Sequence, residues 1–221
     1  MSNVRTWLID FDETLAASSI TWAFRDAVPK FAYEHQLTYE DKNLASVMFT
    51  MQERASQSED MDTLLREFFQ LMGWPLDVRN QLLDDLLSNY RPTLFEDTLD
   101  FLERLKQANQ RVFIVSNNAR TPQHVEMLGL RDYAEGIYTP SLVPGAQRKP
   151  HPSLWEYIAT HVDSVDPQST VVVGDDPWSD GKFAEACNLT CWIVDRMNRF
   201  VEMREQTPYC WVSSLADIPI E

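Results

Sequence analysis

Three short apolar runs, each followed at once by polar residues, constrain the fold of this chain more than any other feature. The runs span Val4–Ile9, Val112–Val115 and Thr170–Val173. Their length and their β-branched residues predict buried strands. Helical patterns lie between the later runs, and further short strands are predicted at Gly136–Thr139 and Cys191–Val194. Strands that alternate with helices in this way predict an α/β fold, in which helices cover both faces of a doubly wound, mostly parallel sheet.

The first two of these strands are too far apart for a simple crossover. A direct connection between parallel strands needs about a dozen residues, but about 100 residues separate Ile9 from Val112. The clearest helical pattern between them comprises Met61, Leu64, Leu65, Phe68, Phe69 and Met72. Asp60 is predicted to cap that helix, and another helix is predicted over Tyr39–Ala55. We therefore predict an α/β core of residues 1–15 and 92–221 and an inserted, entirely helical domain of residues 16–91.

The composition is that of an ordinary globular protein with a strong negative charge. Hydrophobic residues make up 44% of the chain, and 19 basic against 34 acidic residues give a formal net charge of −15. This charge argues against nucleic acid and anionic membranes as partners. Because no apolar run approaches a membrane span and no secretory leader is visible, we expect a cytoplasmic protein. We expect Cys187, Cys191 and Cys210 to be reduced thiols.

Polar residues follow three of the predicted strands. They are Asp10 and Asp12, then Ser116 and Asn117, then Asp175 and Asp176. Asp180 lies one helical turn further on, and Lys149 precedes Pro150 in the loop before the strand at Thr170–Val173. Because ligands of open parallel sheets bind outside the carboxyl ends of the strands, we expect these side chains to form one site.

A cluster of carboxylates at that edge has a chemical consequence. Several carboxylates within a few ångströms cannot all stay ionised unaided, so either their pKa values rise or a divalent cation binds. Oxygen donors favour a hard ion, and Mg²⁺ is the expected cofactor because it also binds phosphate oxygens. Together with Lys149, such a cation would offset the repulsion between a carboxylate and an anionic substrate.

Four segments of the chain resemble the motifs of the haloacid dehalogenase-like hydrolase superfamily. Asp10-Phe11-Asp12-Glu13-Thr14 resembles its first motif, Ser116-Asn117 its second, Lys149-Pro150 its third and Gly174–Asp180 its fourth. All four stand in the family's order and strand context. The resemblance covers residues 1–15 and 92–200, and it implies a Rossmann-like core with a helical cap inserted between the first and second motifs. One departure is Glu13, which stands where many members have glycine.

The resemblance implies catalytic roles for three residues. Asp10 would be the nucleophile that forms an aspartyl-phosphate. Asp12 would be the general acid that protonates the leaving alcohol and then the base that activates water. Lys149 would stabilise the charge on Asp10 and on the phosphate.

The resemblance also implies binding roles. Ser116 and the backbone N–H of Asn117, with Lys149, would hold the phosphoryl group. Asp10, the backbone carbonyl of Asp12 and Asp175 would bind the metal. The spacing leaves open whether Asp176 or Asp180 is the further acid of the metal site.

Asp12 favours one chemistry over another, because an alkoxide leaving group needs a proton and a halide does not. We therefore expect a Mg²⁺-dependent hydrolase of small-molecule phosphomonoesters. Its partner would be a small phosphorylated metabolite, and a monomer or a homodimer would be compatible with the sequence. The alternatives are a sugar-phosphate phosphomutase of the same superfamily and a non-catalytic member that binds a phosphorylated ligand.

Overall fold

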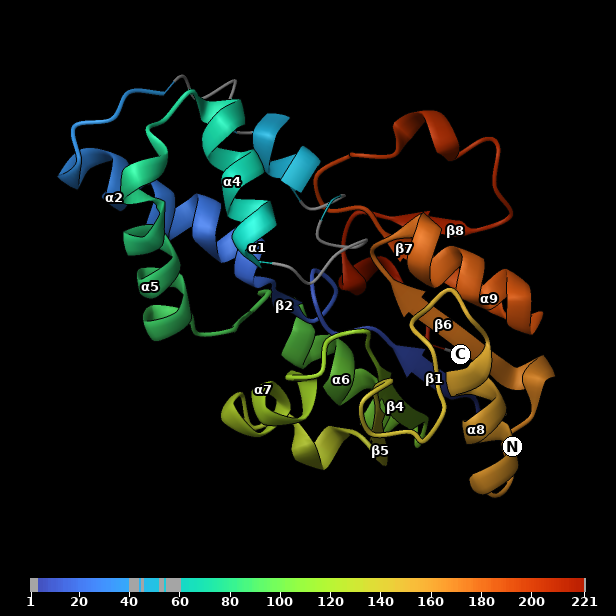
Figure 1. The fold of residues 1–221 in the computed structure, drawn as a ribbon. Coiled ribbons are helices and arrows are strands. Elements are labelled where there is room, and N and C mark those ends of the chain that lie inside the picture. The colour runs from blue at the N-terminus through green and yellow to red at the C-terminus, as the bar shows by residue number, and fades with distance from the viewer. Residues whose placement is uncertain (1–3, 40–43, 45, 52–53, 55–60, 221) are drawn as a thin grey trace. The chain divides into compact units, whose positions relative to one another are not determined.

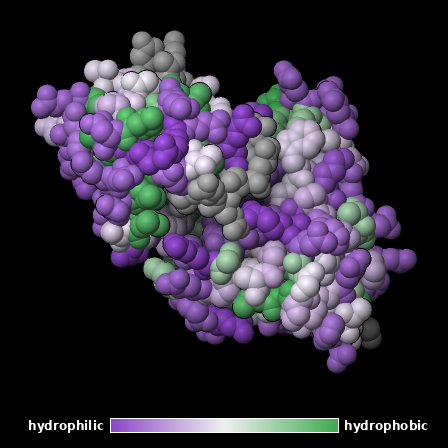
Figure 2. Space-filling model, viewed as in Figure 1, coloured by the Kyte–Doolittle hydropathy of each residue, from purple (hydrophilic) through white to green (hydrophobic). Residues whose placement is uncertain are grey.

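The computed structural model describes residues 4–39, 44, 46–51, 54 and 61–220. The chain forms two compact units (Figure 1): a core unit of Met1–Ala16 and Thr93–Glu221, and a helical unit of Ala17–Pro92. None of the helices in the described part of the chain has the length and apolar character needed to cross a bilayer. Hydrophilic side chains cover most of the face shown in Figure 2, in keeping with the formal net charge of −15.

A six-stranded sheet with the strand order β5-β4-β1-β6-β7-β8 forms the centre of the core unit. The strands are β1 (Thr6–Ile9), β4 (Arg111–Val115), β5 (Gly136–Tyr138), β6 (Thr170–Gly174), β7 (Thr190–Val194) and β8 (Cys210–Val212). Every neighbouring pair is parallel. The predicted α/β fold with a parallel sheet is thus confirmed. The strand β8 was not predicted, because three residues at the sheet edge give no distinct pattern.

Helices cover both faces of this sheet, and alternate residues of the strands point to opposite faces. On β1, Trp7 and Ile9 pack with residues of α6 (Thr98–Gln107) and α7 (Thr121–Met127). Leu8 packs with residues of α8 (Ser153–His161) and α9 (Lys182–Cys187) on the other face. Short 3₁₀ turns span Arg131–Tyr133, Pro167–Ser169, Val201–Met203 and Leu215–Asp217.

The register of the sheet brings the ends of three strands level. Ile9 pairs with Ile114 of β4 on one side and with Val173 of β6 on the other. The residues that follow β1, β4 and β6 therefore lie together at the carboxyl edge, where the polar residues were expected. All three cysteines are free.

The helical unit has a core of its own. It contains α1 (Ser19–Trp22), the π-helix η1 (Ala23–Ala27), α2 (Val28–Glu34), α4 (Met61–Met72), a 3₁₀ turn (Leu76–Val78) and α5 (Arg79–Asn89). The predicted stripe of α4 is buried at Leu64, Leu65, Phe68 and Phe69, where it packs with Phe24 and Phe31.

Two details of the helical prediction need comment. Ala16–Ala17 is the strand β2, which forms a separate two-stranded sheet with β3 (Thr93–Leu94), so the expectation of helix from residue 16 is wrong at its start. Within the predicted helix over Tyr39–Ala55, Tyr39 is not helical and residues 46–51 are. The rest of that span is only partly described, and the predicted cap Asp60 lies outside the described residues.

Candidate active site

Lys149 lies at the centre of the site. Its Nζ donates hydrogen bonds to Oδ1 of Asp10 at 2.7 Å, to Oδ1 of Asp180 at 2.5 Å and to the carbonyl oxygen of Val115 at 2.8 Å. An ammonium group has three N–H donors, so all of them are used. Lys149 is only 6% exposed. Residues from the first, third and fourth predicted motifs thus meet around one buried cation.

Asn117 fixes the main chain at Lys149. Its side-chain Oδ1 accepts a hydrogen bond from the Lys149 N–H at 2.7 Å, and its Nδ2 donates to the Lys149 carbonyl at 3.0 Å. The Asn117 side chain therefore joins the loop after β4 to the loop that carries the lysine. Its own N–H, the group expected to meet a phosphoryl oxygen, is not used in that clamp.

Three carboxylates form a candidate cation site. Asp10, Asp175 and Asp180 each offer one oxygen, and these oxygens lie within 4.8 Å of one another. The donor set consists of carboxylate oxygens only, which suits a hard divalent ion such as Mg²⁺. Asp176 is not in this group: its Oδ1 accepts a hydrogen bond from Trp178 N at 2.8 Å and caps the π-helix η5 (Pro177–Gly181).

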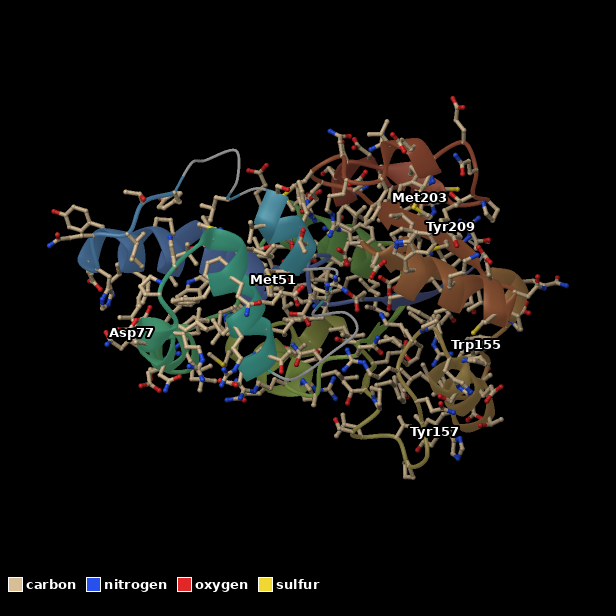
Figure 3. The ribbon with its side chains drawn as sticks, turned by 45° about the horizontal axis from the view of Figure 1, so that its top comes forward. Met51, Asp77, Trp155, Tyr157, Met203 and Tyr209 are labelled. Carbon is tan, nitrogen blue, oxygen red and sulfur yellow. The ribbon has the colours of Figure 1, made fainter. Side chains whose placement is uncertain are left out.

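Two glycines allow Asp180 to take its position. The Asp180 side chain lies directly on Gly174, the last residue of β6. On the other side of Asp180 in the sequence, a Cβ on Gly181 would lie 2.5 Å from the ring of Tyr209. Tyr209, labelled in Figure 3, also donates a hydrogen bond to Glu185 of α9. The close packing at both glycines fixes the turn that carries Asp180.

Burial dominates the electrostatics of the acidic residues. It raises the pKa of Asp10 to about 7, although Lys149 opposes the shift, and that of Asp12 to about 6, although Asn118 opposes it. Burial also raises the pKa of Asp175 well above its usual range, against the opposing charge of Arg199. For Lys149, burial alone would lower the pKa, but the carboxylates of Asp10 and Asp180 outweigh it and raise the pKa. Asp10, Asp12 and Asp175 therefore hold their protons more tightly than carboxyl groups in water do.

The second motif and Asp12 are linked by a residue that sequence analysis missed. Asn118 donates from Nδ2 to Oδ2 of Asp12 at 2.9 Å, and its backbone N–H donates to Oγ of Ser116 at 3.0 Å. Ser116 is buried, at 1% exposure. Between Asp12 and Thr14, Glu13 has a φ of 61°, in the left-handed region that glycine adopts most readily.

Arg199 is the second missed residue. It follows β7, and its Nη2 donates to Oδ2 of Asp175 at 2.5 Å. One signal for it was present in the sequence: Asp195-Arg196-Met197-Asn198-Arg199 follows the predicted strand Cys191–Val194, so these charged residues also belong to the carboxyl edge.

The fold and this acidic edge define a Rossmann-like α/β protein with a candidate hydrolytic site. A family model described as haloacid dehalogenase-like hydrolase matches residues 4–188. The chain belongs to this family of hydrolases, which confirms the resemblance found in the four motifs. A search of curated proteins found no match.

Solved structures of similar fold include both magnesium-bound and phosphate-bound proteins. YfnB from Bacillus subtilis, a HAD-hydrolase bound to magnesium, is 17% identical with a TM-score of 0.71, and 97% of this chain and 96% of that one are covered. A HAD family hydrolase from Deinococcus radiodurans with bound phosphate and sodium is 23% identical with a TM-score of 0.71, covering 98% and 94%. A dehalogenase with an intermediate complex is 19% identical with a TM-score of 0.72, covering 98% and 96%.

Proposed function

We propose that this hydrolase cleaves phosphate monoesters of small molecules through an aspartyl-phosphate on Asp10. The observation that carries the proposal is the hydrogen bond from Lys149 to Asp10, at 2.7 Å. Asp10 also belongs to a cluster of three carboxylates that suits a divalent cation. Such a nucleophile is negatively charged, and so is its substrate. Positive charge must therefore offset the repulsion between the Asp10 carboxylate and the phosphate, and Lys149 supplies part of that charge.

Asp10 and Asp12 have different roles in the first half of the reaction. A carboxylate oxygen of Asp10 attacks the phosphorus atom, and the bond from phosphorus to the ester oxygen breaks. Asp12, whose pKa of about 6 lies near neutrality, gives its proton to the departing alkoxide. The products of this half are the free alcohol and phosphorylated Asp10.

The second half regenerates the enzyme. Asp12, now a carboxylate, takes a proton from a water molecule as the water oxygen attacks the phosphorus atom. The bond between phosphorus and Asp10 breaks, and inorganic phosphate leaves. Ser116 and the backbone N–H of Asn117 bind the phosphoryl oxygens in both halves, while Lys149 offsets the charge on Asp10.

Mg²⁺ is the proposed cofactor. Asp10, Asp175, Asp180 and the backbone carbonyl of Asp12 would hold it, and it would supply positive charge to the oxygens of the phosphoryl group. The magnesium-bound and phosphate-bound structures of similar fold support this proposal.

Asp12 favours phosphate esters over alkyl halides as substrates, although a dehalogenase is among the proteins of similar fold. A halide leaves without a proton, so dehalogenation has no use for an acid two residues after the nucleophile. Asp12 has a raised pKa and a hydrogen bond from Asn118, which suit a group that alternates between acid and base.

The helical unit of Ala17–Pro92 is proposed to act as a cap that excludes water and limits the size of the substrate. Small phosphorylated metabolites are therefore proposed as substrates, in preference to phosphoproteins or nucleic acid.

Phosphate release from a panel of phosphorylated metabolites and of haloacids tests the proposal. We expect phosphate release that requires Mg²⁺, stops with EDTA and is absent from the Asp10→Asn variant. Halide release without phosphate release would contradict it. Transfer of phosphate within a sugar phosphate would identify a mutase instead, and tight binding of one phosphorylated ligand without turnover would identify a non-catalytic protein.

A further inference from the structure

Arg199 holds Asp175 at two points. Its Nη2 donates to Oδ2 of the Asp175 carboxylate at 2.5 Å and to the backbone carbonyl oxygen of the same residue at 3.3 Å. The two side chains are 14% and 10% exposed. A single guanidinium group thus contacts both the side chain and the main chain of one candidate metal ligand.

Arg199 is itself fixed by a buried carboxylate. Asp195, which directly follows β7, is 0% exposed. Its Oδ1 accepts a hydrogen bond from the Arg199 N–H at 2.7 Å, and its Oδ2 accepts from Phe200 N at 3.1 Å and from Arg204 Nη2 at 3.0 Å. The path of the chain after β7 is therefore anchored at the position from which Arg199 reaches Asp175.

Two cationic side chains, the buried Lys149 and the partly buried Arg199, contact the three carboxylates. Lys149 contacts one oxygen of Asp10 and one oxygen of Asp180. Arg199 contacts one oxygen of Asp175. Each carboxylate of the candidate cation site therefore has a charged donor that restricts its rotation.

We propose that Arg199 is a positioning residue of the cation site, which fixes the Asp175 carboxylate so that one of its oxygens stays close to those of Asp10 and Asp180. This inference rests on the cation site of the proposed function but does not depend on phosphatase activity. Hydrogen-bond partners of metal-binding carboxylates typically change metal affinity about 10–100-fold when they are removed.

The direction in which Mg²⁺ affinity changes when Arg199 is removed shows whether Arg199 acts by positioning Asp175 or only by its charge. If Arg199 acted only through its positive charge, its removal would strengthen the binding of a divalent cation, because like charges repel. If it positions Asp175, its removal weakens binding, because Asp175 loses the donor that holds it in place.

Calorimetric titration of the purified protein with Mg²⁺, alongside Mg²⁺-dependent thermal shifts, tests this inference without an activity assay. We expect Arg199→Gln to bind Mg²⁺ at least about tenfold more weakly than the wild type. We expect Arg199→Lys, which keeps the charge but not the planar fork, to give an intermediate affinity. The matched control is Arg111→Gln, which removes a pair with Glu135 (N–O distance 2.7 Å) at the start of β4, the opposite end of the sheet. It should keep the wild-type Mg²⁺ affinity.

A folded Arg199→Gln variant that binds Mg²⁺ as tightly as the wild type, or more tightly, would overturn the inference. Should this variant not fold, Arg199→Lys decides, and wild-type affinity in that variant is the contrary result. A wild-type protein that binds no Mg²⁺ would reject the cation site of the proposed function, whereas Mg²⁺ binding without phosphatase activity would leave the role of Arg199 intact.

Discussion

A Cβ atom on Gly174 would lie 2.1 Å from Cγ of Asp180. Only glycine at the end of β6 therefore leaves room for the carboxylate that contacts Lys149 and belongs to the candidate cation site.

Gly174→Ala should displace Asp180 and damage the cation site. We expect overpacking to lower the free energy of unfolding by about 1–3 kcal/mol and Mg²⁺ affinity to fall by about tenfold or more. Thermal unfolding and calorimetric titration measure the two effects. The control Val172→Ala, also in β6 but buried among other apolar residues, should lower stability and keep Mg²⁺ affinity. Unchanged affinity in a folded Gly174→Ala variant would contradict the role of this contact.

Asp12→Asn should slow the release of poor leaving groups most. An alkyl phosphate needs a proton on its departing oxygen, so its first-turnover rate should fall about 10²–10⁴-fold. The first-turnover rate with p-nitrophenyl phosphate should fall much less, because p-nitrophenolate is stable without that proton. Rapid-quench measurement of the released alcohol compares the two substrates. Equal losses would mean that Asp12 is not the acid.

Without bound cations, the stability of the folded protein should decrease as the pH rises, which is the opposite of the usual effect of carboxylates. The pKa values of Asp10 and Asp12 in the folded protein, about 7 and about 6, exceed the ordinary value of 3.8. The folded state therefore binds protons that the unfolded chain has released. This stabilising contribution is complete below the ordinary pKa and is lost as the pH rises through about 6 and 7.

We therefore expect the melting temperature without cations to fall between about pH 5 and pH 8, and Mg²⁺ to raise it more at the higher pH, because the cation replaces the protons. Comparison with Asp10→Asn isolates the contribution of Asp10, since this variant should show a flatter profile. A Mg²⁺-induced shift that is larger at pH 5 than at pH 8 would argue against carboxylate ligands.

Much of the fold could be predicted because its main signals are local. The apolar runs of β1, β4 and β6 are buried in the structure, and parallel pairing is enough to bring their following residues to one edge. The periodic stripe of α4 likewise follows from hydrophobic spacing. The strand β8 is too short to give a recognisable sequence pattern. Ala16–Ala17 forms a strand although alanine favours helices, so strand pairing outweighs helix propensity there.

The details of the candidate site depend on contacts that spacing does not encode. Asp176 and Asp180 are both acids at plausible positions, and the choice between them depends on the π-helical turn η5 and the close packing at Gly174. The position after β7 points to Arg196 and Arg199 alike, and sequence alone does not choose Arg199, because its partner Asp175 is 24 positions away in a different loop. Asn117 was expected to act through its N–H, while its side chain clamps Lys149.

The identity of the nucleophile is the central claim, and trapping of the covalent intermediate tests it most directly. The wild type and Asp12→Asn would be mixed with a turned-over phosphomonoester and Mg²⁺, quenched in acid within the first turnover, and mapped by peptide mass spectrometry. We expect one phosphoryl group on Asp10, with more of it retained in Asp12→Asn because hydrolysis of the intermediate needs the base. Phosphate release without a phosphoryl group on Asp10, together with activity retained in Asp10→Asn, would contradict the account.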